Sequence, residues 1–149
     1  MKRADYIAPE GVLIDLHPSS KFEALQIMSA RASELSGIPV ESILKALQRR
    51  ENLGSTGIGQ GIAIPHTRIG GIEKPVGLLA RLEQPIDFGS IDDMPVDIVF
   101  VLLTPDREPN IHLNVLACFA RKLRSPRALE QMRSANDAQT LYTTFIEET

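Results

Sequence analysis

The chain has 149 residues, a length that fits one domain with its own hydrophobic core and leaves little room for a second. Apolar residues make up 43% of the chain and charged residues 23%, so the composition excludes a disordered or fibrous protein. The net charge of -3, without a large basic cluster, argues against a nucleic-acid partner, whose phosphates require a basic face.

No segment of the sequence resembles an export signal or a membrane span. The N-terminal stretch begins with charged residues but has no apolar core, and the longest strongly apolar run, residues 98–103, is far shorter than a membrane helix. Cys118 is the single cysteine, so no internal disulfide can form, and its apolar neighbours predict a small core residue. We therefore expect a cytoplasmic protein with no direct membrane insertion.

Two amphipathic helices are predicted in the first third of the chain. Ser20 and Glu23 have the spacing of a helix capping box, and apolar residues then recur every three or four positions until Gly37. A second helix is predicted from Pro39, a favoured first-turn residue, to about residues 52–54.

Two arginines of the second helix point in different directions. With about 100° between successive residues, Arg49 faces away from the apolar stripe, whereas Arg50 lies seven positions after Ile43, on the flank of the stripe. Either Arg50 faces the interior edge of the protein, or both arginines are solvated and favour the negative end of the helix dipole. The helix alone leaves both interpretations open.

Residues 54–61 are the most glycine-dense part of the chain. Such density is typical of unusual backbone angles or of a backbone brought close to another group. The segment has no Gly-Lys-Ser/Thr of a phosphate-binding loop, and Ile64 stands where the dinucleotide fingerprint requires a small residue. A nucleotide-binding site is therefore not expected.

Three strands are predicted after this segment, over residues 62–64, 76–82 and 96–103. The last of them is almost entirely apolar, which predicts a strand covered on both faces.

Three helices are predicted after the strands. The first opens near Asn110 and is apolar almost all round, which predicts a buried helix. Shorter helices are predicted over 126–133 and 137–147. Helices, then strands, then helices predict a mixed α/β (α+β) fold of three layers, in a single domain over residues 1–149.

The three histidines of the chain have different settings. His17 lies in a connector before a helix cap, where a surface position is expected. His66 follows Pro65 at a strand end beside the glycine-rich segment, so its ring is expected to be held rigidly. His112 lies in the first turn of a helix, where backbone N–H groups attract anions and disfavour an imidazolium. Taken singly, either of the last two could be structural.

Taken together, His66, His112 and Arg50 suggest one chemistry. A neutral imidazole is a nucleophile, a second imidazole can donate a hydrogen bond, and a guanidinium can neutralise phosphoryl oxygens. The set is typical of phosphoryl transfer onto histidine.

Two rival chemistries fit the sequence less well. A zinc site needs three or four ligands, but Cys118 lies in an apolar helix and no metal-binding histidine spacing occurs, so no metal is expected. Ser55 lies in Gly-Ser-Thr-Gly rather than in the nucleophile elbow of serine hydrolases.

Residues 54–68, GSTGIGQGIAIPHTR, resemble the enzyme IIA proteins of the bacterial phosphotransferase system, in the fructose/mannitol-type group that includes the nitrogen-regulatory IIA proteins. A looser resemblance extends from about residue 10 to the end. It implies a mixed β-sheet sandwiched between helices and a phosphoryl group accepted on His66 from a phosphohistidine carrier protein. It further implies that His112 and Arg50 assist, and that Ser55, Thr56 and Gly57 shape the phosphate pocket. It implies no metal, nucleotide or other cofactor.

Two branches of this family remain open. Regulatory members signal their phosphorylation state to target proteins, whereas sugar-transport members pass the phosphate to a IIB component. The length of the chain and the residues of its motif segments favour the nitrogen-regulatory branch. A separate IIA subunit of a fructose or mannitol transporter is the alternative.

Overall fold

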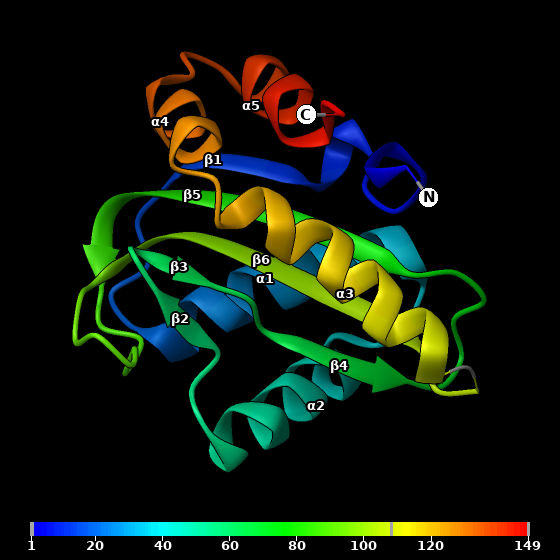
Figure 1. The fold of residues 1–149 in the computed structure, drawn as a ribbon. Coiled ribbons are helices and arrows are strands. Elements are labelled where there is room, and N and C mark those ends of the chain that lie inside the picture. The colour runs from blue at the N-terminus through cyan, green and yellow to red at the C-terminus, as the bar shows by residue number, and fades with distance from the viewer. Residues whose placement is uncertain (1, 108, 149) are drawn as a thin grey trace.

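A mixed β-sheet runs through the middle of the molecule, with helices on both of its faces (Figure 1). This computed structural model describes residues 2–107 and 109–148. The strands are β1 (Val12–Leu16), β2 (Gly57–Gly59), β3 (Ile62–Ala63), β4 (His66–Ile69), β5 (Val76–Ile86) and β6 (Val96–Pro105). The helices are α1 (Lys21–Ser36), α2 (Val40–Leu53), α3 (Pro109–Leu123), α4 (Pro126–Ser134) and α5 (Ala138–Ile146), with short 3-10 turns η1 (Arg3–Asp5) and η2 (Pro9–Gly11) near the N-terminus.

The sheet has the order β1-β5-β6-β3-β2, and β4 also pairs with β6. β6 is antiparallel to β5 and parallel to β3 and β4. Ala63 pairs with Val99 and His66 pairs with Leu102, so β3 and β4 lie one after the other along the same side of β6. The predicted strand over residues 62–64 does end before Pro65, but pairing with β6 resumes at His66, which the sequence did not predict.

Both faces of β6 are buried, as its sequence predicted. The odd-numbered residues of 99–103 pack with apolar side chains of α1 and α2, and the even-numbered residues of 98–102 pack with α3, α4 and α5. This alternation follows from the two-residue period of a strand. The described residues therefore form one domain of three layers around a single sheet.

The two predicted N-terminal helices are confirmed. The Ser20 side chain accepts a hydrogen bond from the Glu23 N–H at the start of α1, and Gly37 ends the helix in the left-handed conformation, with φ of 80°. Helix α2 likewise ends before Gly54. None of the helices within residues 2–107 and 109–148 is both long and apolar enough to span a membrane.

The prediction that α3 is a buried helix holds for one of its faces only. Val115, Phe119 and Leu123 pack into the core, but Leu113 is 62% exposed on the opposite side of the helix. Cys118 is half-buried rather than part of the core. Helix α3 therefore presents a partly apolar face to the solvent.

Candidate functional site

Three of the predicted site residues meet at one cavity. The cavity has a volume of about 390 Å³ and is lined by Arg50 from α2, His66, Thr67 and Arg68 from β4, and His112 and Leu113 from α3. The structure thus brings together two histidines and an arginine that are 16 to 62 residues apart in the chain.

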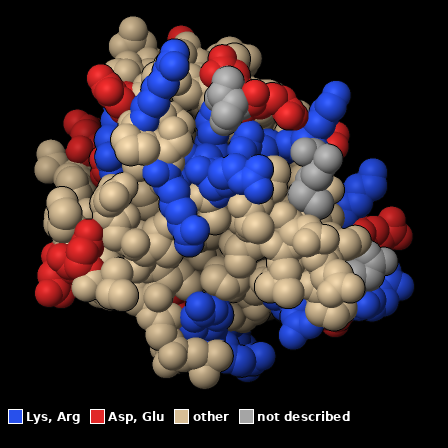
Figure 2. Space-filling view, in the orientation of Figure 1, with Lys and Arg blue, Asp and Glu red and all other residues tan. Residues whose placement is uncertain are grey.

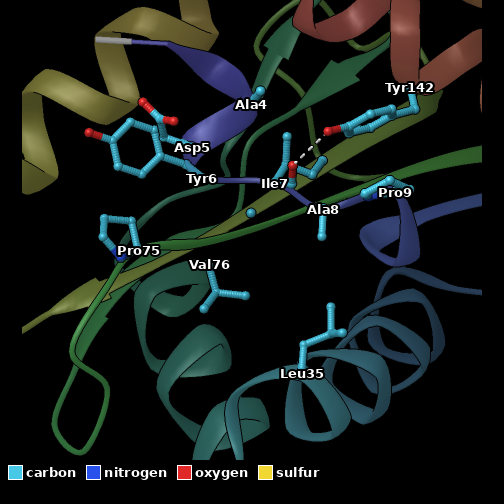
Figure 3. A pocket seen from close by; sticks show the side chains of 11 residues that line it. Ala4, Asp5, Tyr6, Ile7, Ala8, Pro9, Leu35, Pro75, Val76 and Tyr142 are labelled. Atoms are coloured by element: carbon cyan, nitrogen blue, oxygen red, sulfur yellow. Dashed lines mark hydrogen bonds between the residues drawn. The ribbon is translucent and has the colours of Figure 1, made fainter.

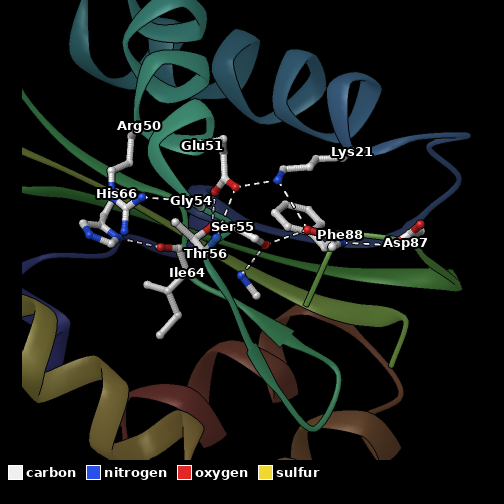
Figure 4. Close-up of polar contacts among 12 residues, drawn as sticks. Lys21, Arg50, Glu51, Gly54, Ser55, Thr56, Ile64, His66, Asp87 and Phe88 are labelled. Atoms are coloured by element: carbon white, nitrogen blue, oxygen red, sulfur yellow. Dashed lines mark hydrogen bonds and ion pairs between the residues drawn. The ribbon is translucent and has the colours of Figure 1, made fainter. Parts of the chain in front are cut away.

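The ring of His66 is held by the backbone just before it. Its Nδ1 lies 2.7 Å from the carbonyl oxygen of Ile64 (Figure 4). A carbonyl oxygen can only accept a hydrogen bond, so Nδ1 carries the proton. In the neutral ring the lone pair then lies on Nε2, the nitrogen that a nucleophilic attack requires.

The surroundings of His66 shift its pKa. Burial lowers its pKa below the ordinary value of 6.5, the hydrogen bond to Ile64 offsets part of this by raising the pKa, and the nearby Arg50 charge lowers it further. The site therefore favours the neutral imidazole.

His112 faces His66 across the cavity. The two ring centroids are 5.5 Å apart, with an angle of 40° between the ring planes. Nδ1 of His112 is hydrogen-bonded to the hydroxyl of Thr104, which is fully buried at the end of β6. Burial, with smaller contributions from His66 and Arg68, lowers the pKa of His112.

Thr104 is a site residue that the sequence analysis missed. It is the first polar residue after the apolar run 98–103, where a side chain at a strand end can reach a site. That position is the signal that could have identified it.

Arg50 faces the cavity, and Arg49 is exposed. The Arg50 Nη1 donates to the carbonyl oxygen of Gly54 at 2.9 Å, so the side chain also satisfies the end of α2. Arg50 therefore combines features of both interpretations. Its side chain lines the cavity, and it also binds a carbonyl group at the C-terminal end of α2.

Ser55, Thr56 and Gly57 do not line this cavity. The Ser55 hydroxyl donates to the carbonyl oxygen of Phe88 at 2.6 Å, and Thr56 is hydrogen-bonded through its N–H and hydroxyl to Glu51. Gly57 packs so closely on Ser90 that a Cβ would lie 2.3 Å from the serine oxygen. Gly57 thus allows the backbone of the glycine-rich segment to lie close to Ser90. The role of Ser55, Thr56 and Gly57 in the phosphate pocket stays a prediction.

A groove continues from the cavity along α3. It has a volume of about 520 Å³, shares Leu113 with the cavity, and is lined by Leu116, Ala117, Ala120, Arg121 and Arg124. On this face, Lys and Arg side chains gather over the C-terminal part of α3, and Asp and Glu side chains lie mostly at the margin (Figure 2). A partner that reaches His66 across this face would meet an apolar strip with basic residues beside it.

A second cavity, of about 370 Å³, lies between the N-terminal turns, α1, the start of β5 and α5 (Figure 3). Tyr6, Leu35, Pro75 and Tyr142 line it, and the Tyr142 hydroxyl donates to the Ile7 carbonyl oxygen at 3.3 Å. Its described lining contains no histidine, lysine or arginine.

The described residues include no group of three or more His, Cys, Asp or Glu side chains placed to hold a metal ion. The chemistry of the His66 cavity is therefore considered from its imidazoles and its guanidinium.

A neutral imidazole, a second imidazole and a guanidinium around an open cavity define a histidine-based site suited to an anionic group. The family model described as "Phosphoenolpyruvate-dependent sugar phosphotransferase system, EIIA 2" matches residues 5–148. The chain belongs to this family.

Two relatives represent the two branches of the family. The chain is 44% identical over 142 residues to a nitrogen regulatory protein from Bradyrhizobium diazoefficiens, covering 95% of this chain and 93% of the relative. It is 30% identical over 139 residues to a fructose-specific EIIA component from Haloferax volcanii, covering 93% of this chain and 90% of the relative. The identity to the regulatory relative is the higher.

Solved structures have the same fold. Nitrogen regulatory protein IIA-Ntr from Neisseria meningitidis matches with a TM-score of 0.90 and 28% identity, over 95% of this chain and 97% of that protein. Mannitol IIA from Escherichia coli, in its complex with phosphorylated mannitol IIB, matches with a TM-score of 0.78 and 17% identity, over 93% and 95%. In that mannitol system the partner of the IIA domain is a IIB component.

Proposed function

We propose that this protein is a cytoplasmic phosphocarrier and regulatory IIA protein. It accepts a phosphoryl group on Nε2 of His66 from a phosphohistidine carrier protein, and it signals its phosphorylation state to target proteins. The observation that carries the proposal is the hydrogen bond from Nδ1 of His66 to Ile64, which leaves the Nε2 lone pair for attack in a cavity beside Arg50 and His112. Similarity to nitrogen regulatory proteins supports the regulatory role.

In the transfer step, Nε2 of His66 forms a bond to phosphorus while the bond from phosphorus to the donor nitrogen breaks. The electron pair of the broken bond stays on the donor imidazole. The His66 ring keeps its proton on Nδ1 and gains positive charge, which the Ile64 carbonyl oxygen stabilises. The transition state is loose, so the site acts through position and charge rather than through further covalent chemistry.

Arg50 and His112 act on the phosphoryl oxygens. The Arg50 guanidinium neutralises their charge. We assign to His112 the neutral tautomer in which its Nδ1 accepts from the Thr104 hydroxyl, because only this tautomer leaves an Nε2–H to donate to a phosphoryl oxygen. Thr104 therefore acts as a positioning residue for His112.

The experiment that tests the proposal is phosphorylation in vitro. Incubation with phosphoenolpyruvate, the first enzyme of the system and a phosphohistidine carrier protein should give an acid-labile adduct. The His66→Ala variant should carry no label, and the His17→Ala variant, which lacks an exposed histidine paired with Glu83, should be labelled like the original protein. Undiminished label in His66→Ala would refute the assignment.

A sugar-transport IIA subunit is the second candidate, favoured by the identity to the fructose-specific component. It would pass its phosphate to a IIB component. Two pull-downs from cell extract distinguish the regulatory function from the transport function. One uses the phosphorylated protein as bait, and the other uses the His66→Ala variant, which stays unphosphorylated. Target proteins bound in only one state support regulation, whereas rapid loss of phosphate to an added IIB component supports transport.

A further inference from the structure

A buried carboxylate lies behind the His66 cavity, at the end of α2. The side chain of Glu51 is only 5% exposed and pairs with Lys21, the first residue of α1, at 2.6 Å between Nζ and Oε2. It also accepts hydrogen bonds from the N–H of Thr56, at 3.1 Å, and from the Thr56 hydroxyl. Both carboxylate oxygens of Glu51 are thus engaged in fixing one residue of the glycine-rich segment (Figure 4).

Two further hydrogen bonds continue from Thr56 to the ring of His66. The carbonyl oxygen of Thr56 accepts from the N–H of Ile64 at 2.9 Å, and the carbonyl oxygen of Ile64 accepts from Nδ1 of His66 at 2.7 Å. The chain of contacts therefore runs from Lys21 through Glu51, Thr56 and Ile64 to the imidazole.

The connection matters because Ile64 and Pro65 lie at the break between β3 and β4. The Ile64 N–H bonds to Thr56, on the side of the chain away from β6, while the Pro65 carbonyl oxygen accepts from the N–H of Leu102 in β6. The position of the carbonyl group that holds His66 thus depends on where Thr56 is held.

The far end of the chain of contacts is also anchored. The ammonium of Lys21 lies 4.8 Å from the centre of the Phe88 ring and donates to the Phe88 carbonyl oxygen at 3.3 Å, and the Ser55 hydroxyl donates to the same oxygen. A buried carboxylate is tolerated only when it is paired and hydrogen-bonded, and these contacts meet that need.

We propose that Glu51, held by Lys21, is a positioning residue for His66, which it fixes through Thr56 and Ile64 in the Nδ1–H form with Nε2 available for the phosphoryl group. The role of this positioning in transfer rests on the proposed function of His66. The charge of Glu51 acts in the same direction as the Ile64 hydrogen bond, since each raises the pKa of His66 against the lowering by burial.

Imidazole nitrogen NMR on the unphosphorylated protein tests this directly, because the two tautomers have different nitrogen shifts. The original protein should show His66 as Nδ1–H alone. In Glu51→Gln, which keeps the shape of the side chain but loses the charge for Lys21, a second tautomer should appear. Phosphorylation of His66 should become about 10-fold slower, the order expected for a misplaced reacting group.

The matched control is Asp97→Asn. It removes the charge from another ion pair, between Asp97 and Arg133 at 2.9 Å, which touches none of the residues in the chain of contacts. This variant should keep the Nδ1–H form of His66 and the original rate of phosphorylation.

Two substitutions of Thr56 keep the test decisive if Glu51→Gln fails to fold. Thr56→Val removes the hydroxyl contact to Glu51 but keeps the N–H contact, so it should give a smaller population of the second tautomer and a smaller loss of rate. Thr56→Ser restores the hydroxyl and should restore both.

A His66 ring that stays entirely Nδ1–H in Thr56→Val, and in Glu51→Gln where that variant folds, would overturn the positioning role and leave the proposed function intact. A second tautomer in these variants but not in Asp97→Asn or Thr56→Ser would support it. The tautomer readout needs no phosphate donor, so it stands even if the original protein is not phosphorylated on His66, a result that would overturn the proposed function instead.

Discussion

Two cavities of nearly equal volume flank the same strand, yet only one is equipped for chemistry. Leu102 of β6 pairs with His66 in β4 on one side and with Gly77 in β5 on the other. The cavity beside His66 holds two imidazoles and a guanidinium, whereas the cavity beside Gly77 is lined by tyrosines, prolines, aliphatic side chains and the single carboxylate of Asp5 (Figure 3). Volume therefore does not distinguish a candidate site in this fold.

The difference lies in what the backbone does at each position. On one side, the break at Ile64 and Pro65 turns a carbonyl group toward an imidazole. On the other, Gly77 lets the chain approach closely, since a Cβ there would lie 3.0 Å from both the Phe100 ring and the Tyr6 carbonyl oxygen. The first arrangement orients an imidazole at a cavity, and the second allows close packing.

After the loss of His66 itself, the largest effect is expected from removal of the Arg50 charge that distinguishes the His66 cavity. Arg50→Gln should slow phosphorylation of His66 about 100-fold, because a donor to the developing phosphoryl charge is lost. Arg49→Gln, one residue away on the exposed side of α2, is the matched control and should leave the rate unchanged. Rapid-quench measurement of labelled protein provides the rate, and equal rates in the two variants would remove Arg50 from the site.

The pH dependence should report the neutral state of His66. Its pKa is lowered from 6.5, so the reactive neutral ring persists through neutral pH, and below the lowered pKa the rate should fall about tenfold for each pH unit. A rate profile measured with the donor protein in excess checks this. A fall that already begins above 6.5 would contradict the burial of the ring.

The same lowered pKa affects stability. The unfolded chain binds a proton at His66 more readily than the folded protein, so the free energy of unfolding should decrease as pH falls from 6.5 through the lowered pKa. Urea unfolding at several pH values measures this dependence. The free energy of unfolding of the His66→Ala variant should decrease less over this pH range. A His66→Ala variant that keeps the whole decrease would contradict the account.

A smaller effect on transfer is expected at Thr104. Thr104→Val has nearly the same shape but no hydroxyl for the hydrogen bond with Nδ1 of His112, so the contact that orients this ring is lost and phosphorylation should slow about 10-fold. Thr104→Ser keeps the hydroxyl and should retain most of the rate. If Val and Ser variants behave alike, His112 does not depend on Thr104.

The smallest effect is expected in the second cavity. Tyr142→Phe removes the hydrogen bond to Ile7 and should lower the free energy of unfolding by about 1 kcal/mol. Phosphorylation of His66 should not change. A slower rate in this variant would show that the two cavities are coupled across β6.

The sequence predicted the elements whose signals are local. The capping box at Ser20, the left-handed stop at Gly37 and the doubly buried run in β6 all follow from residue chemistry within a few positions. His66 and His112 were singled out from their places at element boundaries, whereas the helix face of Arg50 left two interpretations open and the resemblance to the IIA family favoured the site.

Features that depend on distant partners could not be predicted in the same way. Strand β1 is an edge strand defined by its pairing with β5, more than 60 positions away, and it was not predicted. Strand β4 follows a proline, and its pairing depends on β6 continuing past the break. Thr104 and Glu51 gain their roles from contacts to His112 and Thr56, which only the folded chain defines.

Phosphorus–nitrogen NMR on the phosphorylated, nitrogen-labelled protein tests the central claim most directly. The account predicts a single phosphorus–nitrogen coupling to Nε2 of His66, with Nδ1 still protonated and bonded to Ile64. Coupling to Nδ1, or to either nitrogen of His112 or His17, would contradict it.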